Sequence, residues 1–327
     1  MTIRVVFMPI IGHSKIISFF DKLIANNTLA QSYCFVGRDK VGKRTVARYL
    51  SAKMLKIEES KLDTYPDFYY LTRQVDEKTN KLKKEISIAQ SRKVKERLGN
   101  KSWFGNYQVV IIDEAELLNE ESGNALLKIL EEAGEKRVFF LLTEDDSKLL
   151  PTIRSRCQMV FFPLVNDNEI ENGLITLGYD KDLAKESANL SWGKPGRAID
   201  LCTDSDLKNS FSFELNRWEK IISSPFYKRV KEIEDLFKES TPEALVKTGI
   251  NTRSAEKIFE TLETWSVIWR KVMLDKLAKK ENSITAKNNL SLGQMVGLVD
   301  SFKKSQILLA QNINPKLVVE QILLSLN

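Results

Sequence analysis

The chain has 327 residues, of which 43% are hydrophobic and 29% are charged, and its formal net charge at pH 7 is +6. This length exceeds one ordinary hydrophobic core and predicts two or three domains. The composition is typical of a soluble globular protein, and no apolar run reaches the roughly 18 residues of a membrane span. Three scattered cysteines and a single histidine, His13, exclude a cysteine zinc site and a two-histidine mechanism, and they favour a reducing cytoplasm.

Residues 1–163 alternate short apolar strands with helical patterns, which predicts an α/β domain built on a mostly parallel sheet. A strand over 32–36 leads directly into a glycine-rich loop. The helix after this loop carries four apolar residues on one face, namely Val46, Ala47, Leu50 and Met54. Further strands are predicted over 67–71, 107–113, 137–143 and 158–162, and further helices over 87–98 and 120–133.

The pattern becomes helical after Pro163, with an interruption at 192–197 (WGKPGR), and it stays helical to the end. Asn314 is expected to cap the last helix, with Pro315 at its first position. The sequence therefore predicts three domains: an α/β domain over 1–163, a small helical lid over 164–206 and an all-helical domain over 207–327.

A basic segment lies between Leu71 and Lys101. It contains ten Lys or Arg and four Asp or Glu, a local excess of +6 that equals the net charge of the chain. Part of it, residues 72–87, is typical of a polar hairpin. Such a stripe can follow a phosphate backbone. The alternative, that these residues are simply a solvated surface, stays open.

The stretch GRDKVGKRTV at 37–46 follows the phosphate-loop pattern of Gly37, Gly42 and Lys43 up to its last position. Main-chain N–H groups of such a loop cradle phosphates, and the lysine neutralises them. The pattern then requires a hydroxyl for Mg²⁺, and this chain has Arg44, which cannot coordinate a cation. Thr45 is rotated by about 100° around the helix and is a poor substitute. ATP with Mg²⁺ is therefore a candidate cofactor, but Arg44 is evidence against it.

Acidic and small polar residues follow two of the predicted strands. Asp113 ends one strand, where it is suited to hold Mg²⁺ through water, and Glu114 is suited to orient an attacking water. Thr143 ends the next strand, where it is suited to sense a γ-phosphate. The plainer interpretation is that these residues only end strands and begin turns.

Two arginines, Arg154 and Arg156, lead into the last predicted strand. An arginine at this place is suited to reach a neighbouring subunit and to stabilise transition-state charge there as a finger in trans. Without the motifs around them, both would be interpreted as surface arginines at a turn.

Three further motifs stand together with these residues: NALLK at 124–128, LEE at 130–132 and SRC at 155–157. The whole stretch 113–157 resembles the AAA+ clamp-loader family of bacterial DNA polymerase III. The resemblance implies an AAA+ P-loop domain with a parallel sheet, a small helical lid and an all-α C-terminal collar for oligomerisation. It also implies that Arg197, in GKPGRA at 193–198, is the lid arginine that contacts nucleotide in active members, and that the chain end at 312–326 is the final collar helix.

Within this family, the loop ending in Arg44 resembles that of delta-prime subunits more than the loop of gamma/tau motor subunits, which ends in GKTT. Many relatives carry a four-cysteine zinc module after the loop helix. Residues 54–68 hold no cysteine, so zinc is expected to be absent and no metal ligands are assigned.

The resemblance implies a delta-prime-like subunit that helps to load the sliding clamp onto primed DNA as part of the DNA polymerase III holoenzyme. Its own ATPase activity is expected to be weak or absent, and Arg156 is expected to complete the ATP site of a neighbour. The implied partners are gamma/tau and delta subunits in a hetero-pentamer, the sliding clamp, and primer–template DNA through the assembled complex, without a membrane.

Two other functions remain open at this point. An ATP-hydrolysing gamma/tau-like motor subunit is favoured by Asp113, Glu114, Thr143 and Arg197 and opposed by Arg44. A stand-alone P-loop kinase of small nucleotides would have no use for the SRC motif or for the collar-like end.

Overall fold

The computed structural model describes residues 10–76, 81–98, 102–103, 107–131, 136–239, 254–277, 291–311 and 313–324. Parts of the basic segment (77–80 and 99–101) and the end of the helix predicted over 120–133 lie outside the described residues. The chain divides into two compact units, residues 1–203 and 204–327, and each is described by itself.

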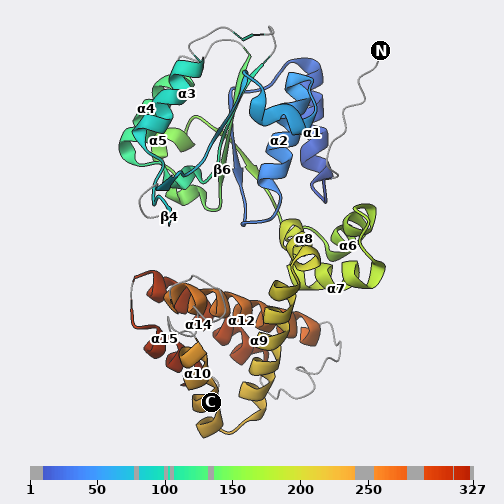
Figure 1. The fold of residues 1–327 in the computed structure, drawn as a ribbon, viewed down its shortest axis with the longest axis vertical. Coiled ribbons are helices and arrows are strands. Elements are labelled where there is room, and N and C mark those ends of the chain that lie inside the picture. The colour runs from blue at the N-terminus through green and yellow to red at the C-terminus, as the bar shows by residue number, and fades with distance from the viewer. Residues whose placement is uncertain are drawn as a thin grey trace. The chain divides into compact units, whose positions relative to one another are not determined.

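The first unit is built on a five-stranded sheet in the order β2-β5-β6-β1-β7 (Figure 1). All of its strand pairs are parallel, as the alternation of strands and helices predicted. The strands are β1 (Ser32–Val36), β2 (Phe68–Leu71), β5 (Gln108–Ile112), β6 (Arg137–Thr143) and β7 (Gln158–Phe161). The carboxyl end of β1 therefore lies between those of β6 and β7, the kind of edge at which open α/β sheets bind ligands.

Helices cover both faces of this sheet (Figure 1). One face packs against α1 (Ser14–Asn26) and α2 (Lys43–Leu55), and the other against α3 (Ile88–Leu98), α4 (Glu120–Glu131) and the short α5 (Pro151–Arg154). Because both faces are covered, β1 and β5 are buried along their whole length, which explains their continuous apolar sequences. The predicted apolar face of α2 is confirmed, since its four residues are all buried.

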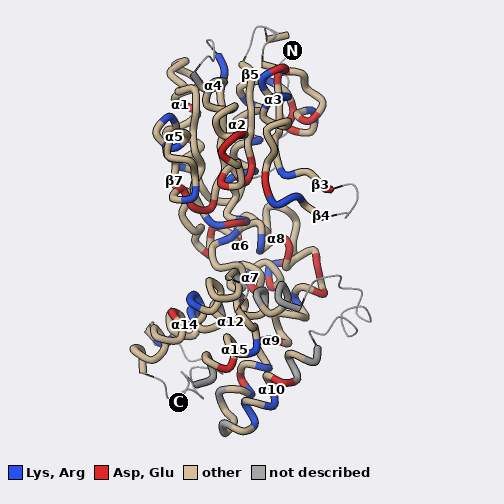
Figure 2. The backbone as a smooth tube through the Cα atoms, turned by 90° about the vertical axis from the view of Figure 1, so that its left-hand side faces the viewer, with Lys and Arg blue, Asp and Glu red and all other residues tan. Residues whose placement is uncertain are grey.

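Short elements connect these layers. A two-stranded antiparallel hairpin, β3 (Val75–Asp76) and β4 (Lys81–Leu82), leaves the end of β2, and Lys and Arg gather around it (Figure 2). The 3-10 turns are η1 (Glu59–Thr64), η2 (Ala115–Leu117) and η3 (Asp146–Lys148).

Three helices complete the first unit: α6 (Asp167–Thr176), α7 (Lys181–Ser191) and α8 (Pro195–Thr203). They share a small core of their own, with Ile170, Leu174, Ala184, Ala188 and Ala198 packed against Ile11 and Val165. Polar caps begin two of them: Asn166 accepts a hydrogen bond at the start of α6, and Asp180 accepts two at the start of α7.

The second unit is helical throughout its described residues. Its helices are α9 (Ser205–Ser223), α10 (Phe226–Glu239), α12 (Ser254–Leu277), α14 (Leu292–Ala310) and α15 (Pro315–Leu324). The core contains Trp218 stacked on Trp265, with ring centroids 4.8 Å apart. Asn314 accepts a hydrogen bond from the Lys316 N–H at 2.9 Å, which confirms the predicted cap. No helix in the described ranges is long and apolar enough to cross a membrane.

Candidate functional site

The glycine loop connects β1 to α2 at the carboxyl edge of the sheet, as its sequence predicted. Gly37 donates its N–H to the Thr143 carbonyl at 3.1 Å, and a Cβ there would lie only 2.8 Å from the Phe162 carbonyl oxygen, so no larger residue fits. Gly42 begins α2 with φ +115°, a conformation that side chains disfavour. The loop therefore keeps the main-chain geometry that its glycines specify.

Lys43 is turned back onto this loop. Its ammonium group donates to the carbonyls of Gly37 at 2.5 Å and Arg38 at 3.0 Å, and the residue is 9% exposed. Burial lowers the pKa of Lys43, because a charged amine is costly to desolvate, while surrounding carboxylates act in the opposite sense. Carbonyl oxygens of the loop itself thus accept the hydrogen bonds of the Lys43 ammonium group.

Arg44 forms an ion pair with Asp113. The guanidinium donates Nε–H to Asp113 Oδ2 at 2.8 Å and Nη2–H to the same oxygen, and it lies over the Tyr70 ring at 5.7 Å. Tyr70 also donates its hydroxyl to Asp113 Oδ2, at 2.5 Å. Burial, the largest single cause, acts to lower the pKa of Arg44, but the charge and hydrogen bond of Asp113 together with Tyr70 and Asp39 outweigh it, so the pKa is raised. Burial, joined by the bond to Asp113, raises the pKa of the Tyr70 phenol, so Tyr70 stays a donor.

Glu114 is paired with a second arginine. Arg73 donates Nε–H to Glu114 Oε2 at 2.7 Å and Nη2–H to Oε1 at 2.5 Å, a bidentate contact. Glu114 has φ +53°, a left-handed conformation that few residues adopt, at the turn that follows β5. Both acidic residues predicted for the site are thus bound to arginines of this chain.

Thr143 and Thr45 lie near the loop in different settings. Thr143 is 1% exposed and pairs with Val36 across β6 and β1. Its hydroxyl donates to the Asp145 carbonyl at 3.1 Å and accepts from the Asp145 N–H at 3.2 Å, so it closes its own turn. Thr45 lies half-buried in the first turn of α2.

Helix α8 is bound to the glycine loop. Gly196 donates its N–H to the Lys40 carbonyl at 2.9 Å, and Lys40 Nζ forms an ion pair with Asp200 at 2.6 Å. A Cβ at Gly196 would lie 3.0 Å from the Lys40 carbonyl oxygen, so the close approach depends on glycine. Arg197 follows directly, with its guanidinium 4.6 Å from the centre of the Trp192 ring. The structure therefore brings Arg197 to the same edge as the loop.

Arg156 lies at the opposite edge of the sheet. Its carbonyl accepts a 2.6 Å hydrogen bond from Ser32, the first residue of β1, whereas the loop follows the last residue of that strand. Five strand residues span about 13 Å between their end Cα atoms. Arg156 is exposed and donates Nη1–H to the Thr152 carbonyl at 3.0 Å, and Arg154 pairs with Asp146 at 2.7 Å. The two edges are thus separate places on one domain.

Sequence reasoning missed Tyr70, Arg73 and the position of His13. Tyr70 and Arg73 belong to β2 and the residues after it, and only the pairing of β2 with β5 brings them to Asp113 and Glu114. His13 is buried under the loop, where its Nε2 lies 2.9 Å from the Val41 carbonyl oxygen. Burial lowers the pKa of His13.

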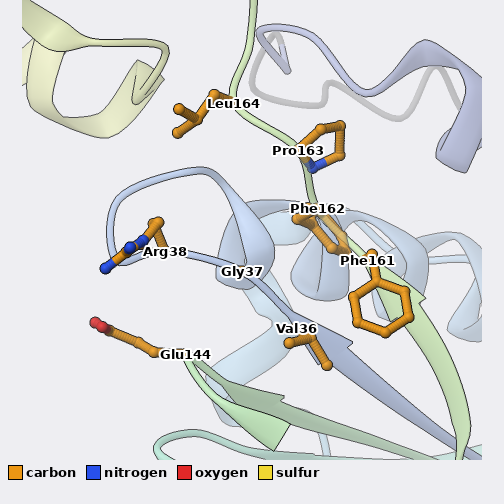
Figure 3. Close-up of a pocket in the computed structure, with 8 residues that line it drawn as sticks. All are labelled: Val36, Gly37, Arg38, Glu144, Phe161, Phe162, Pro163 and Leu164. Atoms are coloured by element: carbon orange, nitrogen blue, oxygen red, sulfur yellow. The ribbon is translucent and has the colours of Figure 1, made fainter. Parts of the chain in front are cut away.

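A pocket of about 540 Å³ opens beside the loop. Figure 3 shows apolar side chains along the end of β7, with Arg38 and Glu144 together at the opposite rim. The lining residues are Val36, Gly37, Arg38, Glu144, Phe161, Phe162, Pro163 and Leu164. Burial raises the pKa of Glu144, while Lys43 acts to lower it. Within the described residues, no group of three or more His, Cys, Asp or Glu is placed to hold a metal ion.

Comparison with known proteins finds sequence similarity over most of the first unit. Residues 12–166 match the family described as DNA polymerase III, delta subunit. The chain is 34% identical over 141 residues to DNA polymerase III subunit delta′ of Escherichia coli, a match that covers 42% of this chain and 40% of that protein. Residues 12–166 are therefore similar in sequence to subunits of DNA polymerase III.

The relation extends to the tau/gamma subunits. The chain is 33% identical over 180 residues to subunit tau/gamma of Haemophilus influenzae, covering 51% of this chain and 25% of that protein. These matches span less than half the length of the relatives themselves. A gamma subunit-related protein of Thermotoga maritima has a similar structure, with a TM-score of 0.50 and 20% identity over 95% of this chain and 98% of that one. The predicted α/β fold with a parallel sheet, followed by a helical remainder, is confirmed.

Proposed function

We propose that this protein is a delta-prime-like subunit of a bacterial clamp loader, which helps to load the sliding clamp onto primed DNA in the cytoplasm. Its partners would be gamma/tau and delta subunits in a hetero-pentamer, the sliding clamp, and primer–template DNA through the assembled complex. The observation that carries the proposal is Arg156, exposed and anchored through Ser32 at the edge of the sheet that faces away from the chain's own loop.

An arginine in this position is suited to act on another subunit. It is too far from its own loop to stabilise a phosphate there, and its main chain is fixed by the hydrogen bond to β1. A finger supplied in trans stabilises the charge that develops during phosphoryl transfer. The chain's own loop, in contrast, pairs Arg44 with Asp113 and Arg73 with Glu114, an arrangement that supports weak or absent hydrolysis.

The domain organisation proposed with this function keeps the division into 1–163, 164–206 and 207–327. The separate small core of α6, α7 and α8 supports a lid. The helical second unit supports a collar, because helices such as α14 and α15 expose apolar side chains that include Val296 (50%), Ile307 (58%) and Leu317 (61%). Zinc has no place in this proposal.

The test is the ATPase activity of the complex reconstituted with its gamma/tau and delta subunits. Replacing Arg156 with Ala should lower DNA-stimulated turnover at the affected site by roughly 10³ while assembly is retained. Arg154→Ala is the matched control, because that arginine lies two residues away, is also exposed and pairs with Asp146 within the chain. Equal turnover of the Arg156→Ala and wild-type complexes would remove the proposal.

A gamma/tau-like motor subunit is the second candidate. The observation that favours it is the preserved loop geometry, with Lys43 in the loop and Arg197 brought to the same edge. The two functions differ in the activity of the isolated chain: a motor subunit hydrolyses ATP in the presence of primed DNA, and a delta-prime-like subunit does not.

A further inference from the structure

The position that a divalent cation takes beside a phosphate loop does not fit Mg²⁺ in this protein. Asp113 is the carboxylate expected to face the metal, and its side chain is 10% exposed. Its Oδ2 atom accepts hydrogen bonds from Arg44 Nε, Arg44 Nη2 and Tyr70 Oη, and its Oδ1 atom accepts from the Glu114 N–H at 3.1 Å. A carboxylate oxygen has about two lone pairs, so Oδ2 is fully used.

The second carboxylate is occupied in the same way. Both oxygens of Glu114 accept from the guanidinium of Arg73, and the pair is only partly exposed, at 33% and 24% for the two side chains. Neither acidic residue therefore carries an unbalanced negative charge that would attract a divalent ion to this edge.

Arg44 stands at the position where the loop pattern requires a metal-binding hydroxyl. A guanidinium is permanently charged and has no lone pair to offer a metal. The contacts with Asp113 and with the Tyr70 ring hold it at the edge next to Lys43. A second cation placed there would meet two fixed positive charges.

We propose that Arg44 is a built-in cation that takes the place of Mg²⁺ at this loop, and that Asp113, Tyr70 and Arg73 keep divalent ions out. Nucleotide at the loop is then held by main-chain N–H groups, Lys43 and Arg44, and its affinity does not depend on Mg²⁺. This inference rests on the proposed function, because a loop without Mg²⁺ lacks the ion that clamps the phosphates during hydrolysis.

The experiment measures the affinity of a fluorescent ATP analogue, N-methylanthraniloyl-ATP, for the full chain in excess Mg²⁺ and in excess EDTA. The decisive variant is Arg44→Thr, which completes the pattern and releases Asp113. Arg48→Thr is the matched control: Arg48 lies one turn further along α2 and forms a bidentate pair with Asp63, at 2.9 and 3.0 Å, away from the proposed cation position. Thermal unfolding checks that each variant is folded, and Arg44→Ser replaces Arg44→Thr if the latter does not fold.

The expected result is the same measurable affinity in the two buffers for the wild type and for Arg48→Thr, and a wild type that does not bind the analogue in either buffer would contradict the inference. For Arg44→Thr, Mg²⁺ should strengthen binding by roughly tenfold, within the usual range for coupled ligands. Stronger binding of the analogue by the wild type in Mg²⁺ than in EDTA would overturn the inference. The same affinity of Arg44→Thr in Mg²⁺ and in EDTA would also overturn it. The result is independent of the Arg156 assay, because that residue lies at the other edge of the sheet.

Discussion

The arginines at the two edges of the sheet differ in their surroundings. At the carboxyl edge, Arg44 and Arg73 are bound to Asp113 and Glu114 of the same chain, so the charges of the expected ATP site cancel internally. At the amino edge, Arg156 is exposed, and its main chain is fixed to the start of β1. The carboxyl edge thus holds its arginines in ion pairs within the chain, whereas the amino edge has an arginine exposed at its surface.

The largest expected effect sharpens this comparison directly. In the reconstituted complex, Arg156→Ala should lower ATPase turnover at the neighbouring site by roughly 10³, whereas Lys43→Ala should leave turnover nearly unchanged. The physical reason is that only the first residue would face a phosphate being transferred. Steady-state hydrolysis with primed DNA measures both variants, and a collapse of activity in Lys43→Ala would show that the loop edge is the working one.

The second prediction concerns the stability of the paired carboxyl edge. Asp113→Ala should lower the free energy of unfolding by about 1–3 kcal/mol, because it leaves the half-buried Tyr70 hydroxyl and the Arg44 guanidinium without their acceptor. Asp63→Ala is the control, since Asp63 also pairs with an arginine but its side chain is 64% exposed. The contrast lies in the carboxylate, which is 10% exposed in Asp113, and ion pairs of solvent-exposed carboxylates contribute about 0–1 kcal/mol.

Urea denaturation of the full chain measures the two variants. Equal losses for Asp113→Ala and Asp63→Ala would mean that the pair at the carboxyl edge is no more than a surface ion pair.

The third prediction uses the only histidine as a pH probe of the carboxyl edge. Burial lowers the pKa of His13 below its ordinary value of 6.5, so the unfolded chain binds more protons than the folded chain once the pH falls below 6.5. Stability from this residue is therefore complete above pH 6.5 and is lost as the pH falls toward the folded-state pKa, at no more than about 1.4 kcal/mol per pH unit.

Because His13 is the single histidine, its imidazole C–H resonances report its pKa without ambiguity in an NMR titration. His13→Gln should remove this part of the pH dependence of unfolding. A titration midpoint at or above 6.5 would contradict the lowered pKa.

The smallest expected effect concerns the basic hairpin, whose Lys83 and Lys84 take no part in the ion pairs described above for the two edges. If Lys83 and Lys84 bind nucleic-acid phosphates, changing both to Glu should make the dependence of DNA affinity on salt less steep. The slope of log affinity against log salt concentration should change by about one unit for each phosphate that is no longer neutralised. Both residues are exposed. Binding of the reconstituted complex to primed DNA over a salt series measures the slope, with Lys15→Glu on α1 as an exposed control. An unchanged slope would indicate that the hairpin is simply a solvated surface.

Local pattern was enough for most of the fold. Continuous apolar runs predicted β1 and β5, a period of 3.6 predicted the buried face of α2, and Asn314 before Pro315 predicted the start of α15. Each of these signals acts over a few neighbouring residues, so the order of residues along the chain contains it. The replacement of a hydroxyl by Arg44 was likewise visible in the sequence.

What the sequence by itself determined was therefore the elements, the glycine loop and the residue types at its edge. Only the tertiary structure decided their partners: Tyr70 and Arg73 reach Asp113 and Glu114 because β2 pairs with β5, and Ser32 holds Arg156 across 124 positions in the chain. Strand order and side-chain pairing depend on packing between segments far apart in sequence, and no local pattern specifies them.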